Sequence, residues 1–250
     1  SDGVGIDVKN RVKKYGIKDL IVVDKNKRTG RSVVFLGRSG EKTVLVYRGA
    51  SQDFKPVEIK KSDIQNTKWL YISSLGGNIS TLDKVVKLAM SMDKKLMINP
   101  GKRELTDHRP KLLKLLSKAN IILLNREEAS ILAKRAYSNI KGIVSKIAEY
   151  CPKSIIIITD GINAVHLGVN NELMYVIIKP VKSVDMTGAG DAFGSGFLAG
   201  YIRSKENLNS AINLAIKNSA SVVTKIGAKY GLLKKTKLSN KLNYQLKKLK

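Results

Sequence analysis

The sequence predicts an α/β protein in which helices cover a mostly parallel sheet, with a small antiparallel sheet beside it. Residues 20–48 hold three short β-rich runs, at 20–23, 32–36 and 43–47, separated by turn residues. From residue 69 onward, short apolar runs alternate with helical stretches, as in a parallel sheet covered by helices. Hydrophobic residues make up 43% of the 250 residues, which is enough for one core in a single domain.

The elements of the main sheet follow from local patterns. Buried parallel strands are predicted at 69–73, 96–99, 121–124 and 155–159, because each run is short and apolar. Apolar residues at helical spacing predict helices over 80–92, 110–116 and 140–150. A hairpin is expected over 164–169 and 174–178, with Asn170 and Asn171 at its turn. Helices are predicted over 189–201 and 209–224, followed by a docked, Lys-rich amphipathic helix with leucines at 238, 242, 246 and 249.

The chain is strongly basic. Lys and Arg number 46 against 20 Asp and Glu, a formal net charge of +26. A basic surface attracts phosphate in nucleic acid, in lipid headgroups or in nucleotides. The lysines are spread along the whole chain, without zinc-finger spacing or a basic region followed by heptads. We therefore interpret the charge as a solvated Lys-rich surface and expect no specific nucleic-acid binding.

Cysteine content and hydropathy bear on the compartment. Cys151 is the single cysteine, so the chain forms no internal disulfide, and a reducing compartment such as the cytoplasm is expected. No apolar run approaches the roughly 20 residues of a membrane-spanning helix, so no membrane association is expected.

The most informative motif is the segment 185–191, which reads DMTGAGD and ends where a helical pattern begins. The first N–H groups of a helix have no intrahelical acceptor and lie at the positive end of its dipole, so they can hold an anion. Gly188 and Gly190 let the backbone approach that anion closely. Asp191 would then lie in the first turn, where a carboxylate can accept the proton of a hydroxyl that attacks phosphorus. The motif favours phosphoryl transfer, with an ordinary Gly-rich helix cap as the alternative.

Two other nucleotide-binding patterns are excluded. In a dinucleotide motif G-x-G-x-x-G that begins at Gly188, the third glycine would fall on Phe193, and Gly194 comes one place late. The segment 37–43 has several P-loop residues, but Glu41 separates its glycine from the Lys-Thr pair and the segment joins two β runs. We interpret it as a hairpin turn.

The motif at 185–191 resembles the C-terminal signature of the PfkB or ribokinase family of carbohydrate and nucleoside kinases, Asp-Thr-x-Gly-Ala-Gly-Asp, with Met186 in place of the usual Thr. The Asn-x-x-Glu element of that family appears at 125–128, and 159–161 resembles its nucleotide-side loop. Asn218 and the segment 225–229 resemble its adenine-pocket and ion-site segment. These elements occur in the family's order and cover essentially the whole chain.

The resemblance implies a three-layer, ribokinase-like fold over residues 1–250, with a β lid at about 18–50 that closes over a sugar. Tyr47 and Arg48 are similar to lid residues that face the substrate in the family, although an exposed Tyr-Arg pair at a strand end is an equal alternative. It further implies a cytoplasmic kinase, with a homodimer through the β lid permitted.

The resemblance also implies a mechanism. The transferring phosphate of ATP would lie on the main-chain amides of Gly188, Ala189 and Gly190, and Asp191 would take the proton of the acceptor hydroxyl. The residues that would bind ATP are Thr159, Gly161, Asn218 and Gly227.

Two cations are implied as well. Asn125 and Glu128 would organise Mg²⁺ through its waters, since a hard cation prefers oxygen ligands. Glu128 as a plain helix-terminal acid is the alternative. Asp185 and Thr187 resemble positions near a monovalent-cation site, which K⁺ would occupy.

The sequence departs from the family at its front. The family's first strand brings an Asp, and a Gly-Gly-x-x-x-Asn element follows it, both before the point that corresponds to Ser1. We therefore expect an N-terminally truncated chain. The segment 76–78 is not that element, because it follows a mid-chain strand. Asn163 and Ala164 occupy a place where a second glycine is often found.

Two rival functions remain at this point: a nucleoside kinase of the same fold, and a basic nucleotide- or nucleic-acid-binding protein without kinase activity. His108 and His166 lie in different elements without further ligands at suitable spacing, so we expect surface or packing roles for them and no metal site.

Overall fold

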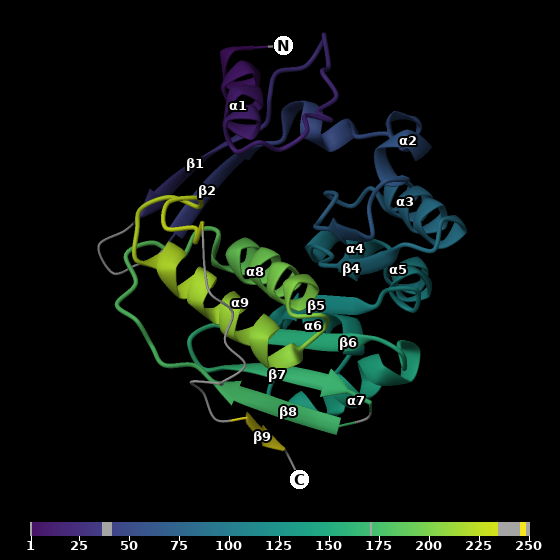
Figure 1. The fold of residues 1–250 in the computed structure, drawn as a ribbon, viewed down its shortest axis with the longest axis vertical. Coiled ribbons are helices and arrows are strands. Elements are labelled where there is room, and N and C mark those ends of the chain that lie inside the picture. The colour runs from purple at the N-terminus through teal and green to yellow at the C-terminus, as the bar shows by residue number, and fades with distance from the viewer. Residues whose placement is uncertain (1, 37–41, 171, 235–245, 249–250) are drawn as a thin grey trace.

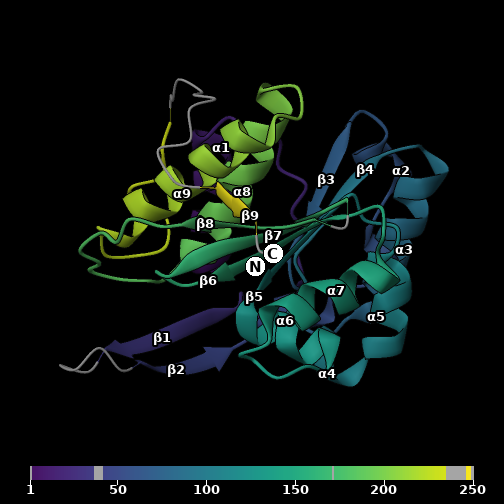
Figure 2. The same ribbon diagram turned by 90° about the horizontal axis from the view of Figure 1, so that it is seen from below.

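The computed structural model describes residues 2–36, 42–170, 172–234 and 246–248. Within them, the main sheet has seven strands in the order β3-β4-β5-β6-β7-β8-β9 (Figures 1 and 2). The pairs from β3 to β6 are parallel and those from β6 to β9 are antiparallel. The strands are β3 (Trp69–Ile72), β4 (Lys95–Ile98), β5 (Ile121–Asn125), β6 (Ile155–Asp160), β7 (Ala164–Val169), β8 (Glu172–Ile177) and β9 (Leu246–Lys248).

Helices cover both faces of this sheet. Figure 2 shows α8 (Ala189–Arg203) and α9 (Leu208–Val223) on one face, where they pack on a core that includes Met97, Ile157 and Leu167. The opposite core is formed with residues of α3, α5, α6 and α7. In chain order, the helices from α2 to α7 are α2 (Lys61–Ile64), α3 (Ile79–Ser91), α4 (Lys102–Asp107), α5 (Arg109–Leu116), α6 (Arg126–Ala133) and α7 (Ile140–Tyr150). The predicted parallel strands, the helices predicted between 80 and 224 and the two strands of the predicted hairpin are thereby confirmed, while Asn171 of the hairpin turn lies outside the described residues.

A second, two-stranded sheet projects from the main body (Figure 2). It pairs β1 (Arg31–Leu36) with β2 (Lys42–Tyr47) in antiparallel register, from Arg31 opposite Tyr47 to Leu36 opposite Lys42. The hairpin turn predicted at 37–43 falls mostly on 37–41, outside the described residues. Two 3-10 helices, η1 (Gly49–Asp53) and η2 (Pro56–Glu58), lead from β2 toward the main sheet.

The β run predicted at 20–23 is wrong. This segment is not a strand, and its four apolar side chains are exposed. A β-rich composition forms a strand only where a partner supplies the ladder hydrogen bonds, and 20–23 pairs with none of the described strands. The segment lies beside an unpredicted helix, α1 (Gly3–Lys14), whose cap is Asp2. That carboxylate accepts hydrogen bonds from Gly5 N–H (2.9 Å) and Thr29 Oγ1 (2.7 Å).

The predicted terminal helix is also wrong where it can be compared. Residues Leu246–Lys248 form β9, which pairs antiparallel with β8, with Leu246 opposite Val176. The other three leucines of the predicted stripe lie outside the described residues. An edge strand such as β8 presents unpaired N–H and C=O groups, and a short segment that reaches it gains ladder hydrogen bonds in place of helical ones.

None of the helices in the described ranges is long and apolar enough to cross a bilayer.

His166 lies buried in β7, and from its burial we predict that the stability of the fold depends on pH. It is opposite Ile158 and Tyr175, and neither ring nitrogen has a hydrogen-bond partner among the described residues. Burial, together with the charge of Arg126, lowers the pKa of His166 below its usual value, while Asp160 opposes this shift. The folded protein therefore binds this proton less readily than the unfolded chain, so stability is lost as the pH falls below about 6.5.

We expect His166→Leu to flatten that pH dependence. The free energy of unfolding, measured in urea at pH 7.5 and pH 5.5, should fall less in the variant than in the wild type. The same fall in both proteins would show that His166 does not carry the acid sensitivity.

Candidate functional site

The start of α8 lies beside the carboxyl ends of the parallel strands. Gly188 is its N-cap, with φ of 83°. A Cβ atom at Gly188 would lie 2.6 Å from the carbonyl oxygen of Ala228, so both the backbone conformation and the packing require glycine. The loop before α8 thus packs closely against the segment that follows α9.

A buried carboxylate fixes this loop. Asp185 is 8% exposed, and its side chain accepts hydrogen bonds from Thr187 N–H (2.9 Å), Thr187 Oγ1 (2.7 Å) and Gly227 N–H (2.9 Å). The N–H groups of Val184 and Asp185 both donate to the carbonyl of Val223. The polar groups of the DMTGAGD motif therefore fix the conformation of its backbone.

The first turn of α8 offers free donors. Ala189 N–H donates to Met186 O (3.2 Å) and Ala192 N–H to Gly188 O (2.9 Å), but the N–H groups of Gly190 and Asp191 have no acceptor among the described residues. A Cβ atom at Gly190 would meet nothing within 4 Å, so open space lies beside these donors. Two free N–H groups at the positive end of a long helix are suited to hold an anion.

Asp191 projects from the same turn. Its side chain is exposed, and its carboxylate makes no hydrogen bond or ion pair with the residues that the structure describes. The Tyr71 hydroxyl of β3 is close by: burial raises the pKa of Tyr71 to about 12, and the charge of Asp191 adds to the shift. A Cβ atom at Gly194 would overlap that hydroxyl, so Gly194 lets α8 pack on the end of β3.

Asn125 and Glu128 form a capping box at the start of α6. Asn125 Oδ1 accepts from Glu128 N–H (2.8 Å), and Asn125 N–H donates to Glu128 Oε2 (2.9 Å). Burial raises the pKa of Glu128, and the nearby charges of Glu127 and Glu104 act in the same direction. The pair is thus a structural cap. The oxygen lone pairs that it leaves unused can still accept hydrogen bonds from the water ligands of a hard cation.

The predicted nucleotide-side residues differ in what they offer. Thr159 lies opposite Asn125 across the β5–β6 pair, and Gly161 follows with φ of 55° and open space around it. Asn218 is buried with both amide atoms engaged, by Ala192 O (2.8 Å) and Leu233 N–H (2.9 Å). Gly227 N–H is bound to Asp185. Asn218 and Gly227 therefore support the loops around α8 with their polar groups.

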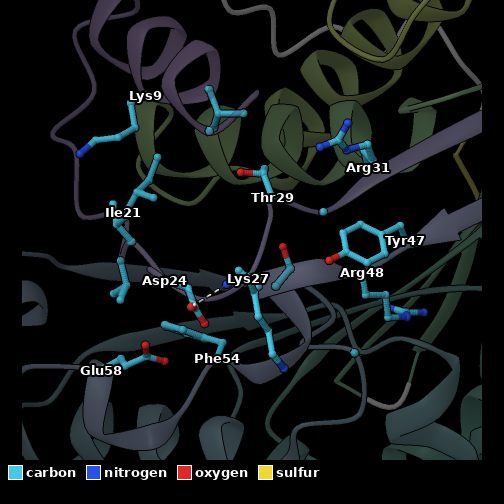
Figure 3. Close-up of a pocket in the computed structure, with 18 of the residues that line it drawn as sticks. Lys9, Ile21, Asp24, Lys27, Thr29, Arg31, Tyr47, Arg48, Phe54 and Glu58 are labelled. Atoms are coloured by element: carbon cyan, nitrogen blue, oxygen red, sulfur yellow. Dashed lines mark hydrogen bonds between the residues drawn. The ribbon is translucent and has the colours of Figure 1, made fainter. Parts of the chain in front are cut away.

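Tyr47 and Arg48 line a cleft of about 930 Å³, whose other walls are formed largely by α1, by the segment 20–24 and by residues 27–32. Figure 3 shows both on one wall, with Lys27 and Phe54 across from them. The loop after β3 borders the same cleft with Ser74, Leu75 and Gly76.

Sequence reasoning missed the residue that shapes this loop. Glu104 of α4 is 1% exposed, and its carboxylate accepts hydrogen bonds from the N–H groups of Leu75 (2.7 Å), Gly77 (3.1 Å) and Gly101 (3.1 Å). The spacing of Gly101 and Glu104 is that of a capping box, which predicts the local contact. The contacts with the loop cross 27 and 29 residues and have no local signal.

The two histidines lie apart, with His166 inside β7 and His108 between α4 and α5. In the described ranges, no three His, Cys, Asp or Glu residues come together as a metal site.

Comparison with known proteins places this geometry in context. Residues 1–235 match the pfkB family of carbohydrate kinases. The chain is 27% identical over 249 residues to a sugar kinase of Archaeoglobus fulgidus that is described as uncharacterized, covering 92% of both chains. It is 26% identical to ribokinase of Schizosaccharomyces pombe, covering 91% of this chain and 72% of that one.

A solved structure has the same fold. The E. coli protein described as a ribokinase II, in complex with ATP and Mg²⁺, superposes with a TM-score of 0.81 at 20% identity. The match covers 93% of this chain and 77% of that chain.

Proposed function

The chain belongs to the pfkB family of carbohydrate kinases, and on this premise we propose that it transfers the γ-phosphate of ATP to a hydroxyl group of a sugar or sugar derivative. The observation that carries the site assignment is the first turn of α8. There, free N–H groups of Gly190 and Asp191 lie beside the exposed, unpartnered Asp191 carboxylate, within the described part of the chain.

The N–H groups at the start of α8 hold the phosphoryl group while it is transferred. Gly188 and Gly190 keep side chains away from it, and the helix dipole offsets its developing charge. Ala189 N–H joins them only if its bond to Met186 is released, so the donors that support the assignment best are those of Gly190 and Asp191.

Asp191 acts as the general base. Its carboxylate accepts the proton of the acceptor hydroxyl, the hydroxyl oxygen bonds to the γ-phosphorus, and the bond to the bridging oxygen breaks to release ADP. Thr159, Gly161, Asn218 and Gly227 line the nucleotide side, where Asn218 and Gly227 act through the backbone that they hold in place.

Mg²⁺ neutralises phosphate charge when bound with ATP. Asn125 and Glu128 suit it only through water, since each is engaged in the capping box and Mg²⁺ keeps several of its own waters. For K⁺, the carboxylate of Asp185 and the hydroxyl of Thr187 offer oxygen ligands in the loop before α8. Turnover that is faster in K⁺ than in Na⁺ would support this site, and equal turnover would remove it.

The segment at about 18–50 acts as a lid, with Tyr47 and Arg48 facing the substrate. The same segment pairs with a second copy of the chain to form a dimer. The pairing is supported by side chains of β1 and β2, which are exposed and apolar at Val33, Phe35 and Leu45. Sedimentation should give a dimer that dissociates in Phe35→Lys, whereas a monomeric wild type would contradict the pairing.

The function is tested by coupled ADP release across a panel of sugars and nucleosides. We expect one sugar or sugar derivative to stimulate ADP release above the acceptor-free rate. Stimulation by nucleosides alone would favour a nucleoside kinase, and no stimulation by any acceptor would contradict the kinase assignment.

A further inference from the structure

One buried hydroxyl next to the start of α8 has no hydrogen-bond partner among the described residues. It belongs to Tyr71, which lies in β3. A buried donor without an acceptor destabilises a fold, whereas a phenylalanine ring fills the same space without that cost. The Tyr71 hydroxyl is therefore a donor that the described part of the fold does not use.

The place of this hydroxyl follows from its contact with α8. A Cβ atom at Gly194 would overlap the hydroxyl, so the hydroxyl occupies the space that a side chain at Gly194 would fill. Side chains of an α-helix point toward its N-terminus and lie over the residues three and four places earlier. For Gly194 those residues are Asp191 and Gly190. The Tyr71 hydroxyl therefore lies against the turn that carries the proposed base.

The carboxylate of Asp191 is an acceptor within reach of this donor. Residues three apart on a helix have Cβ atoms about 5 to 6 Å apart, and the exposed Asp191 side chain makes no hydrogen bond or ion pair that would hold it elsewhere in the described ranges. Burial and, after it, the charge of Asp191 raise the pKa of Tyr71 to about 12. The hydroxyl therefore keeps its proton at neutral pH and can donate it in a hydrogen bond.

We propose that Tyr71 is a positioning residue for Asp191, whose carboxylate accepts a hydrogen bond from the Tyr71 hydroxyl when a sugar is bound. This inference rests on the proposed function. The hydroxyl fixes one carboxylate oxygen and leaves the other directed at the sugar hydroxyl, from which it takes the proton. The same hydrogen bond satisfies the buried donor, so the reacting complex gains a contact that the free protein lacks.

Tyr71→Phe tests this inference, because it removes the hydroxyl and keeps the ring. With the sugar of the panel that stimulates ADP release most, kcat should fall by about tenfold or more, the usual effect of losing a hydrogen bond to a charged group. KM for ATP and for the sugar should stay unchanged. The midpoint of thermal unfolding should not fall, because the lost hydroxyl has no partner in the described part of the fold.

Tyr201→Phe is the matched control. Tyr201 lies on α8 ten residues after Asp191, and its ring stacks on that of Phe197 with 5.8 Å between the centroids. It is as far along the helix from the proposed base as the end of α8 allows within two residues. Loss of its hydroxyl should leave kcat at the wild-type value.

A double-mutant cycle separates the positioning of Asp191 from a general effect on packing. The cycle uses Asp191→Ala, because the amide oxygen of Asp191→Asn could still accept the hydrogen bond. Transfer of label from γ-³²P-ATP measures the low residual turnover. We expect Tyr71→Phe to leave kcat unchanged in the Asp191→Ala background, since the hydroxyl acts only through the carboxylate. A fall in kcat by the same factor in both backgrounds would show a packing role and overturn the inference.

The remaining outcomes distinguish the inference from the proposed function. Wild-type kcat in Tyr71→Phe would overturn the inference and leave the kinase assignment standing. A raised KM for the sugar with kcat unchanged would assign the hydroxyl to sugar binding and would also overturn the inference alone. No sugar-stimulated ADP release from the wild type would contradict the kinase assignment and the inference together.

Discussion

Asp191→Asn is expected to lower kcat by about a hundredfold or more while leaving ATP affinity nearly unchanged. The amide keeps the size of the side chain but cannot accept the hydroxyl proton. General bases contribute on the order of 10² to 10⁴ in rate, which corresponds to roughly 3 to 5 kcal/mol of barrier. The measurements are kcat by ADP release and ATP affinity by calorimetry.

Folding should not obscure this result. The Asp191 side chain is exposed and makes no hydrogen bond or ion pair within the described residues that its replacement would break. Asp93→Asn is the matched control, because Asp93 is exposed, follows α3 and lies in another part of the fold. Wild-type turnover in Asp191→Asn would remove Asp191 from the mechanism.

Gly190→Ala is expected to lose about a hundredfold in turnover without losing stability. The added methyl group meets nothing within 4 Å in the free protein, and alanine favours a helix over glycine by up to about 1 kcal/mol. With ATP bound, the same methyl group would occupy the open space in front of the free N–H groups and push the phosphate away from them. The loss of one such donor typically costs about a hundredfold in kcat.

Two other glycine variants serve as comparisons for Gly190→Ala. Gly188→Ala should lower stability as well as activity, because Gly188 has φ of 83° and would contact Ala228. Gly3→Ala in α1 should leave activity unchanged, because that position is open and distant in the chain from α8. If Gly190→Ala turns over like the wild type, no phosphate lies against the start of α8.

The central strands could be predicted because their composition reflects burial on both faces. Ile121, Ile122 and Leu124 of β5 are all fully buried, so an apolar run of strand length indicates them directly. The residues at 20–23 are equally apolar yet exposed, because forming a strand also needs a partner. The leucine spacing that includes Leu246 suits a helix, but the position next to β8 favours pairing. Both failures concern neighbours that are distant in the sequence.

The same distinction applies to the site. The start of α8 and Asp191 could be predicted because a helix start and its first turn are local in sequence. The role of Glu104 could not, since it organises a loop nearly thirty residues away. Asn218 could be singled out by its place in the chain, but only its buried contacts with Ala192 and Leu233 indicate that its amide supports the backbone.

The central claim is that the start of α8 and Asp191 transfer the γ-phosphate of ATP to an acceptor hydroxyl. Its most direct test follows the label from γ-³²P-ATP in the wild type and in Asp191→Asn. The account predicts one labelled phosphate on the acceptor for each ADP released by the wild type, and very little transfer by the variant although it still binds ATP. Label recovered as inorganic phosphate with an unlabelled acceptor, or equal transfer by both proteins, would contradict it.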